Sequence, residues 1–269
     1  MAPAGRGFAK YEGLGNDFLV IDATTEDAVS AEDAARLCDR HFGVGGDGVL
    51  LVLPPRDPSH TARMKVLNAD GSVPEMCGNG LRCVALHVAL EGRLPDGPLT
   101  FETDAGLRPA ELRREGATAH VRVDMGVVRF LGTRTLATPL GDVEVLLGVA
   151  GNPHAILFGD YASADVDRLG PVLATHAAFP EGTNVEFCRV TADAIEVVVW
   201  ERGVGRTLAC GTGACAVAVV ACATGRWKDV ARVPVRLPGG TLLVEPGLGE
   251  ASTWMTGPAR RVFEGRLGP

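Results

Sequence analysis

Residues 76–90 read MCGNGLRCVALHVAL, and residues 209–224 read ACGTGACAVAVVACAT. Each stretch begins with a Cys-Gly-polar-Gly turn and continues, over 81–90 and 214–224, as a run that is apolar on nearly every face. Both runs are shorter than the ~20 residues of a membrane-spanning helix, so each predicts a helix buried inside a domain. Such a helix needs other elements packed around all its faces, and the flanking strands can supply them. The sequence therefore predicts an α/β (α+β) protein with two domains, each a β-barrel-like mixed sheet around one central apolar helix.

An internal repeat relates the two halves of the chain. The turn cysteines Cys77 and Cys210 are 210 − 77 = 133 positions apart in a chain of 269 residues. Two further pairs recur in the same order, namely Gly15-Asn16 with Gly151-Asn152, and Asn68 with Glu201, nine residues before each cysteine. We therefore expect two pseudo-symmetric domains, residues 1–123 with 257–269 and residues 124–256.

Short β-type runs alternate with a few helices along the chain. Ala31 to His41 has the pattern of an amphipathic surface helix, with Ser30 as its N-cap. The segments expected to be strands are Phe18–Asp22, Val49–Leu53, Met64–Leu67, Ala119–Val123 and Ile195–Trp200.

Composition narrows the class of protein. The chain is 46% hydrophobic and 22% charged, typical of a globular protein with a sizeable core. A net charge of −7 argues against nucleic acid or an anionic membrane as the main partner. The N-terminus has no apolar segment of the kind found in secretory signals, so we expect a cytoplasmic protein with reduced thiols. The seven cysteines have neither disulfide-framework nor metal-site spacing.

The two turn cysteines suggest proton transfer at carbon. Each precedes a predicted helix, whose first N–H groups and dipole favour an anion and lower a thiol pKa from about 8.5 to roughly 3.5–7.5. We expect one site between the halves, with one thiol on each wall. There, one thiolate would remove an α-hydrogen from one face of an amino acid, and the other thiol would return a proton to the opposite face. No motif for pyridoxal phosphate is present.

The remaining cysteines and the glycine-rich segment 43–48 are expected to be structural. Segment 43–48 lacks the spacing of a P-loop or a dinucleotide fingerprint, and it predicts a tight loop. The cysteines expected to pack as small apolar groups are Cys38, Cys83, Cys188, Cys215 and Cys222.

Six motifs together resemble the diaminopimelate epimerase family, in order and from about residue 8 to residue 265. They are Gly13–Phe18, Asn68–Ser72, Met76–Gly80, Gly151–His154, Glu201–Gly203 and Ala209–Gly213. The resemblance implies a cofactor-independent, metal-free enzyme that interconverts LL- and meso-2,6-diaminopimelate, in lysine and peptidoglycan-precursor synthesis. It also implies a homodimer.

The resemblance assigns roles to individual residues. Cys77 is the implied proton donor and Cys210 the implied acceptor in the LL-to-meso direction. His154 and Glu201 are implied to tune the pKa of the two thiols. The implied substrate contacts are Gly78, Asn79, Gly211 and Thr212 at the reacting carboxylate, and Asn16, Asn68, Asn152, Asn184, Glu201 and Arg202 around the substrate.

Two positions depart from the family pattern. Some members carry Gln where this chain has Gly48, so that side-chain contact is absent. Some carry Tyr at a dimer contact where this chain has Phe263, which lacks the hydroxyl group.

Two alternatives remain at this point. The first is a sister racemase of the same fold that acts on proline, hydroxyproline or histidine; proline-type members have His where this chain has Asn79, whereas histidine racemases are harder to exclude. The second is a thiol redox or metal-binding protein that uses Cys77 and Cys210 as a dithiol.

Overall fold

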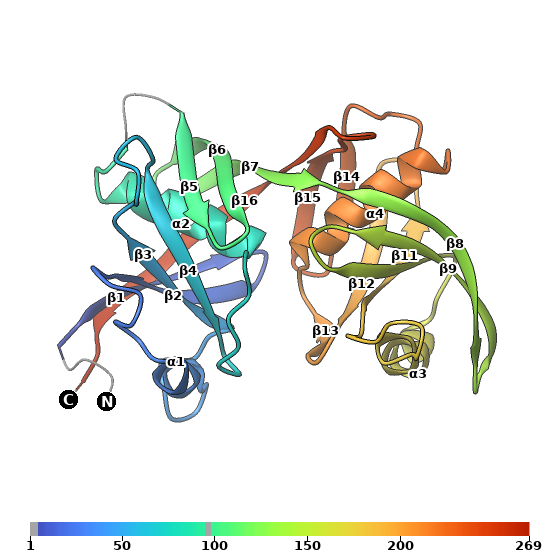
Figure 1. The fold of residues 1–269 in the computed structure, drawn as a ribbon, viewed down its shortest axis with the longest axis horizontal. Helices are drawn as coiled ribbons and strands as arrows, with labels where there is room; N and C mark the ends of the chain where they lie inside the picture. The colour runs from blue at the N-terminus through green and yellow to red at the C-terminus, as the bar shows by residue number, and fades with distance from the viewer. Residues whose placement is uncertain (1–4, 95–97, 269) are drawn as a thin grey trace. The chain divides into compact units, whose positions relative to one another are not determined.

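The computed structural model describes residues 5–94 and 98–268. The chain forms two compact units, Met1–Val123 with Gly257–Pro269 and Asp124–Thr256. Two long strands contribute residues to both units: β7 (Thr118–Val127) and β16 (Ser252–Arg266). Figure 1 shows one central helix among the strands of each unit, cyan in the first unit and orange in the second.

The first unit is a closed ring of eight strands. The hydrogen-bonded order is β1-β2-β3-β4-β5-β6-β7-β16, and β1 pairs with β16 to complete the ring. Besides β7 and β16, the strands are β1 (Gly7–Gly13), β2 (Asn16–Asp22), β3 (Gly48–Leu53), β4 (Ala62–Asn68), β5 (Leu99–Thr103) and β6 (Gly106–Glu115).

The helix α2 (Gly78–Leu90) packs against β1, β2, β3, β4 and β6, and every residue from Gly78 to Ala89 is buried. The shorter α1 (Ala31–Cys38) is amphipathic and packs its apolar face on β3 and β4. The all-round apolar sequence of α2 is thus matched by an all-round strand wrapping, which removes its apolar surface from water.

The second unit also has its strands packed around one central helix. Its strand order is β16-β15-β14-β12-β11-β10-β9-β8, and β13 pairs with β12. Besides β16, the strands are β8 (Arg129–Thr138), β9 (Gly141–Val149), β10 (Pro153–Phe158), β11 (Asn184–Val190), β12 (Ile195–Glu201), β13 (Gly205–Thr207), β14 (Val233–Leu237) and β15 (Gly240–Glu245).

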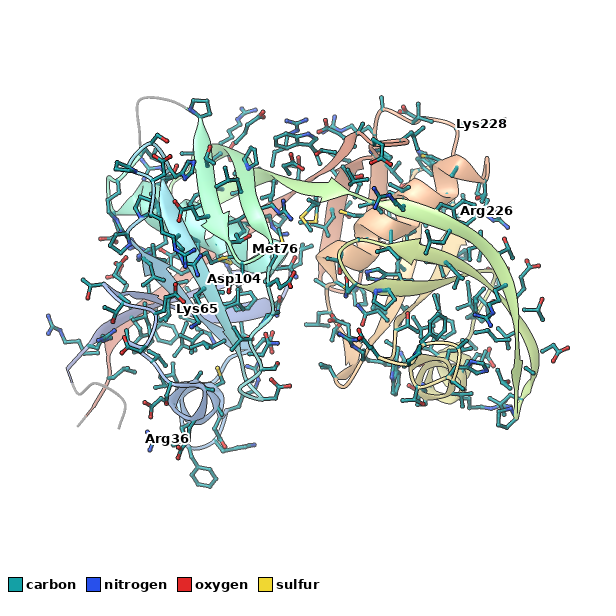
Figure 2. All side chains as sticks on the ribbon, in the orientation of Figure 1. Arg36, Lys65, Met76, Asp104, Arg226 and Lys228 are labelled. Carbon is teal, nitrogen blue, oxygen red and sulfur yellow. The ribbon has the colours of Figure 1, made fainter. Side chains whose placement is uncertain are left out.

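The central helix of this unit, α4 (Gly211–Ala223), packs against strands from β8 round to β15. Past its C-terminal end, Arg226, labelled in Figure 2, lies over the ring of Phe158 with 5.0 Å between the guanidinium carbon and the ring centroid. The amphipathic α3 (Ser163–Ala174) packs on β11 and β12.

The strand pairings establish the internal repeat as a repeat of topology. In the first unit, α1 connects the parallel strands β2 and β3, and α2 connects the parallel strands β4 and β5. In the second unit, α3 connects parallel β10 and β11, and α4 connects parallel β12 and β14. Parallel neighbours need such crossovers, so each unit has two of them at equivalent places.

Most sequence expectations for elements are confirmed. All five expected strands lie within β2, β3, β4, β7 and β12, and Ser30 caps α1 through its hydroxyl oxygen, which accepts the Asp33 N–H at 3.0 Å. The expectation that this helix reaches His41 is wrong, because α1 ends at Cys38. The Asp39 carboxylate accepts the His41 and Phe42 N–H groups at 2.7 and 2.8 Å and turns the chain instead. Among the described residues, no helix is both long and apolar enough to cross a bilayer.

Candidate active site

Cys77 is the N-cap of α2. Its backbone is extended (φ −136°, ψ 110°), and its sulfur accepts the Gly80 N–H at 3.3 Å. The Leu81 N–H donates to the Cys77 carbonyl at 2.8 Å, which starts the helix. The thiol is half-buried, in contrast to the fully buried Cys83 one and a half turns later. Cys77 therefore sits at the positive end of a helix dipole, where negative charge is stabilised.

A directional chain of hydrogen bonds passes beside this cysteine. The wholly buried Arg82 donates from Nη1 to Asn79 Oδ1 at 2.9 Å, and Asn79 Nδ2 donates to Asn16 Oδ1 at 3.0 Å. Asn16 Nδ2 then donates to Asp47 Oδ2 at 2.6 Å. Because Arg can only donate and a carboxylate can only accept, the two ends fix which way both amides face.

The glycine-rich segment 43–48 holds the carboxylate end of that chain. Asp47 also accepts the Asp17 N–H at 3.1 Å and pairs with Arg40 at 2.9 Å. Lys10, which is buried, pairs with Asp17 at 2.5 Å and donates to the Gly45 carbonyl. The segment is a tight loop, as expected, and its Asp47 anchors the hydrogen-bond chain that runs from Arg82 through Asn79 and Asn16.

Asn68 lies at the end of β4 and contacts its own turn. Its Nδ2 donates to Ser72 Oγ at 2.9 Å, and Ser72 Oγ donates to Asp70 Oδ1 at 2.6 Å. Gly48, in the adjacent strand β3, pairs with Asn68. A Cβ at position 48 would lie only 2.8 Å from the Leu67 carbonyl oxygen. A side chain at position 48 would therefore require the strand to shift.

Cys210 is the N-cap of α4 and reproduces the Cys77 geometry. Its backbone is φ −128°, ψ 109°, and its sulfur accepts the Gly213 N–H at 3.4 Å. The Thr212 hydroxyl lies 3.5 Å from the sulfur and Asn184 Nδ2 lies 4.0 Å from it. Unlike Cys77, this thiol is buried. The chain thus builds the same cap twice, with different exposure.

The environment of Cys210 raises the pKa of its thiol well above the ordinary value. Burial is the largest cause, followed by the negative charges of Glu201 and Glu186, which outweigh the hydrogen bonds from Thr212 and Gly213. The expectation that the helix start acidifies both thiols is therefore wrong for Cys210. The position of Cys210 just before a predicted helix does not reveal that two carboxylates, from β11 and β12, lie near its sulfur.

Arg202 and Glu201 follow one another at the end of β12, close to Asn184. The Arg202 N–H donates to Asn184 Oδ1 at 2.9 Å, and its Nη1 donates to the Glu181 carbonyl at 2.5 Å. Glu201 Oε1 accepts the Thr207 hydroxyl at 2.6 Å. Three of the substrate contacts implied by the resemblance are thus neighbours within the second unit.

Asn152 and His154 belong to a second buried chain. His154 Nε2 lies 3.0 Å from Asn152 Oδ1, and His154 Nδ1 lies 2.7 Å from Glu186 Oε1. The side chains of His154 and Glu186 are both fully buried. A Cβ on Gly213 would lie 2.6 Å from Glu186 Oε1 and 3.2 Å from Cys210 Sγ, so only glycine leaves room for both groups.

Sequence reasoning missed three charged residues of these networks: Arg82, Asp47 and Glu186. Arg82 was visible as the one cation within an apolar helix, and Asp47 as the one charge within a glycine-rich loop. Glu186 had a fainter signal, a carboxylate between Val185 and Phe187 in a strand-like run. Charge at an otherwise apolar position is the signal that could have found all three.

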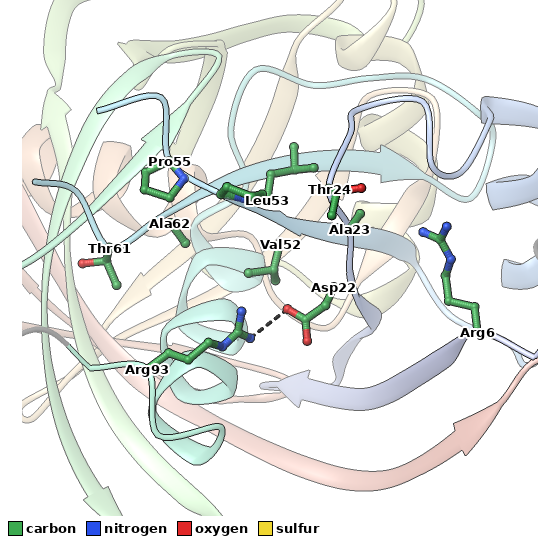
Figure 3. Close-up of a pocket in the computed structure, with 11 residues that line it drawn as sticks. Arg6, Asp22, Ala23, Thr24, Val52, Leu53, Pro55, Thr61, Ala62 and Arg93 are labelled. Atoms are coloured by element: carbon green, nitrogen blue, oxygen red, sulfur yellow. Dashed lines mark hydrogen bonds and ion pairs between the residues drawn. The ribbon is translucent and has the colours of Figure 1, made fainter. Parts of the chain in front are cut away.

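Of the other five cysteines, Cys188 contacts the second network, with its Sγ 3.6 Å from the Glu186 carbonyl oxygen. Cys38, Cys83, Cys188 and Cys215 are buried, as expected, whereas Cys222 is half-buried, and none of the seven forms a disulfide. A pocket of about 440 Å³ beside β2 and β3 is lined by Arg93, which pairs with Asp22 at 2.7 Å (Figure 3). Neither this pocket nor one of about 510 Å³ beside β13 is lined by a turn cysteine. Among the described residues, no group of three or more His, Cys, Asp or Glu could hold a metal ion.

Comparison with known proteins identifies the family. The model of the diaminopimelate epimerase family matches residues 8–131 and 148–262, which include all the site residues above. The diaminopimelate epimerases of Microcystis aeruginosa and Desulforudis audaxviator are 43% and 45% identical, over 96% of this chain and 97% and 98% of those proteins.

Among solved structures, a probable proline racemase from Agrobacterium radiobacter (TM-score 0.74, 19% identity, 98% of this chain and 93% of that one) shares the fold. So does a phenazine biosynthesis protein from Bacillus anthracis (TM-score 0.77, 16% identity, 98% and 99%). At such identities the likeness establishes the fold alone. The full-length match to the family model and to relatives above 40% identity establishes more: this chain is a member of the diaminopimelate epimerase family.

Proposed function

We propose that this protein is a cofactor-independent epimerase that interconverts LL- and meso-2,6-diaminopimelate, in lysine and peptidoglycan-precursor synthesis. The observation that carries the proposal is the pair of matched caps: two central helices, each begun by a cysteine whose sulfur accepts an N–H of the first turn. The curated relatives named as diaminopimelate epimerases cover nearly the whole chain and support the substrate.

The proposed chemistry uses each thiol at one face of the α-carbon. In the LL-to-meso direction, the Cys210 thiolate takes the α-hydrogen as a proton, and the electron pair left on carbon spreads into the carboxylate. The Cys77 thiol then donates its proton to the opposite face. The enzyme ends with a thiol at 210 and a thiolate at 77, which is the form needed for the reverse reaction. This mechanism requires both sulfur atoms to reach one carbon.

The helix starts would hold the reacting carboxylate. Their first N–H groups have no carbonyl partner within the helix, so they are available to stabilise the charge that develops on the carboxylate. We propose Gly78, Asn79, Gly211 and Thr212 for this role. For the rest of the substrate we propose Asn16, Asn68, Asn152, Asn184, Glu201 and Arg202, with His154 and Glu201 tuning the thiols.

A raised thiol pKa at Cys210 fits its proposed work. The thiol form is the proton donor of the meso-to-LL direction, and burial together with Glu201 and Glu186 favours that form. Once deprotonated, a thiolate of raised pKa is the stronger base, which helps it remove a weakly acidic α-hydrogen.

We also propose a homodimer and a cytoplasmic location. Phe263 on β16 is half-exposed, and its ring meets that of Phe8 edge-on with centroids 5.9 Å apart. The neighbouring Val262 is also half-exposed, and a second copy that packs on this strand would cover exposed apolar side chains. The free thiols suit a reducing compartment.

The substrate is tested by offering the purified protein LL-diaminopimelate, L-proline and L-histidine and following inversion by chiral chromatography. We expect inversion of diaminopimelate only. Inversion of histidine alone would overturn the proposed substrate while leaving the two-thiol chemistry standing. A tightly bound zinc ion together with no inversion of any amino acid would favour a thiol-metal protein instead.

A further inference from the structure

We propose that Glu186 is a positioning residue that acts through His154 to hold the side-chain amide of Asn152 with its N–H₂ group turned toward the substrate. This inference rests on the proposed function, in which Asn152 contacts the substrate. Glu186 lies in β11, His154 in β10 and Asn152 in the turn before β10, so the chain of contacts runs across two paired strands.

The pairing of Glu186 with His154 is close and excludes water. Their contact is 2.7 Å between Oε1 and Nδ1, and both side chains have no exposed surface. Within the part of the chain that the structure describes, Glu186 Oε2 is buried without a hydrogen-bond partner. A buried carboxylate in this position is costly unless its charge is balanced. The fold tolerates that cost next to Cys210, which points to a role in the site.

Charge balance and the contact with Asn152 together favour one arrangement of protons on the pair. A carboxylate with a neutral imidazole would bury one net negative charge, whereas one more proton makes the pair neutral. The second arrangement also fits the other side of the ring, where Nε2 faces Asn152 Oδ1 at 3.0 Å. An oxygen there needs an N–H from the imidazole. A proton on Nε2 meets both requirements, with the Asn152 amide oxygen facing the ring.

The proton on Nε2 fixes the amide of Asn152. With Oδ1 accepting from His154, Nδ2 is turned away from the ring and becomes a donor toward the half-exposed side of Asn152. Two N–H groups suit a substrate carboxylate and repel an ammonium group. Without a proton on Nε2, the amide would turn over and present its oxygen instead.

The first unit fixes the equivalent asparagine by a similar device. Asn16, the counterpart of Asn152 in the repeat, is held in one orientation by a chain that begins at the buried Arg82 and ends at Asp47. In each unit a buried charged group thus sets an amide at the Gly-Asn turn. Glu186 takes this part in the second unit, with His154 as the intermediary.

The first unit also offers a matched contrast. Glu102 accepts a hydrogen bond from His60 Nδ1 at 2.9 Å, so it too forms a Glu–His pair. Its carboxylate is fully used, because it also accepts the Arg56 and Asp57 N–H groups at 2.9 Å. This pair fastens a loop. Glu102→Gln is therefore a control that alters a Glu–His pair away from the cysteines.

The test compares Glu186→Gln with Glu186→Leu. Both remove the charge near Cys210, so kcat should change alike in both, to within about threefold. Only Gln can donate an N–H to His154 Nδ1 and so keep the proton on Nε2. We expect KM for diaminopimelate to stay near the wild-type value in Glu186→Gln and to be roughly tenfold higher in Glu186→Leu, because a hydrogen bond to a charged group is weakened.

A second background and a spectrum make the test specific. In Asn152→Ala, the KM difference between the two Glu186 variants should vanish, and Glu102→Gln should leave KM unchanged. Nitrogen-15 NMR of the wild-type protein should show His154 Nε2 protonated at neutral pH, a result that needs no activity. If Glu186→Leu does not fold, this spectrum and Glu186→Gln still decide the matter. Equal KM values in the two variants, a difference that persists without the Asn152 amide, or a bare Nε2 would overturn the proposal. Wild-type protein that inverts no diaminopimelate would instead overturn the proposed function.

Discussion

The two cysteine turns have nearly the same backbone but different buried charged side chains around them. Cys77 and Cys210 cap their helices with φ and ψ values that differ by less than 10° (−136°, 110° and −128°, 109°). Behind the first turn lies the buried cation Arg82, within α2 itself. Beside the second lies the buried carboxylate Glu186, from a neighbouring strand. The repeat has kept geometry and changed electrostatics.

This difference suits a reaction that needs one thiol and one thiolate at a time. Two identical surroundings would favour the same protonation state at both sulfurs. A carboxylate near Cys210 favours its thiol form. The asymmetry therefore gives the two matched halves different roles in the catalytic cycle. The following predictions test it, from the largest expected effect to the smallest.

Removing either thiol should abolish inversion. We expect Cys77→Ala and Cys210→Ala each to lower the rate of diaminopimelate epimerisation by roughly 10⁴-fold or more, because each removes a proton carrier from one face. The rate is followed by chiral chromatography of the product. Cys222→Ala, at the half-buried end of α4, is the matched control and should retain activity. Substantial inversion by either single variant would contradict the paired roles.

Removing the buried cation of the first unit should cost stability and substrate affinity together. Arg82→Met leaves Asn79 Oδ1 and the Pro258 carbonyl without the donors that now reach them at 2.9 and 3.1 Å. We expect the free energy of unfolding to fall by about 2–4 kcal/mol, measured by urea denaturation, and KM to rise. A variant with normal stability and normal KM would show that Arg82 does not hold the Asn79–Asn16 hydrogen-bond chain in place.

The Glu–His pair of the first unit should contribute stability alone. Burial tends to raise the pKa of Glu102, but hydrogen bonds from the Asp57 N–H, His60 and the Arg56 N–H hold it at about 2. Since this is below the unfolded value of about 4.3, its contribution is present above pH 4.3 and is lost as pH falls through about 2. We expect Glu102→Gln to lower the free energy of unfolding by about 1–2 kcal/mol at pH 7. The difference from wild type should disappear near pH 2, and an unchanged difference there would refute the assignment.

Neutralising the carboxylates near Cys210 should make its thiolate easier to form. After burial, Glu201 is the largest cause that raises the pKa of this thiol. Glu201→Gln should lower that pKa, so alkylation of Cys210 by iodoacetamide at pH 8 should become several-fold faster, as measured by mass spectrometry. Glu196→Gln, which changes a partly exposed carboxylate of the same strand, is the control. A slower or unchanged rate would contradict the electrostatic account of the second unit.

The sequence predicted the helices, strands and cysteine turns of this molecule better than it predicted the contacts of its buried charged residues. The central helices were predictable because an all-round apolar run has few other places to lie, and the strands because their apolar runs are bounded by turns. The Cys77 and Cys210 turns were predictable because they occur twice. The partners of Glu186 and Asp47 were not, since they lie 32 and 31 positions away and only strand pairing brings them together.

The central claim is that two thiols act on opposite faces of one carbon, and a single measurement in D₂O tests it most directly. Wild-type enzyme is given LL-diaminopimelate with its ordinary α-hydrogen, and the earliest product is examined by mass spectrometry. We predict that the first meso product carries one deuterium at the inverted carbon while the remaining LL substrate is unlabelled, because one sulfur takes the hydrogen and the other delivers a proton exchanged with solvent. Early meso product that retains the substrate's own hydrogen would mean that one group moves it from face to face, and would contradict the account.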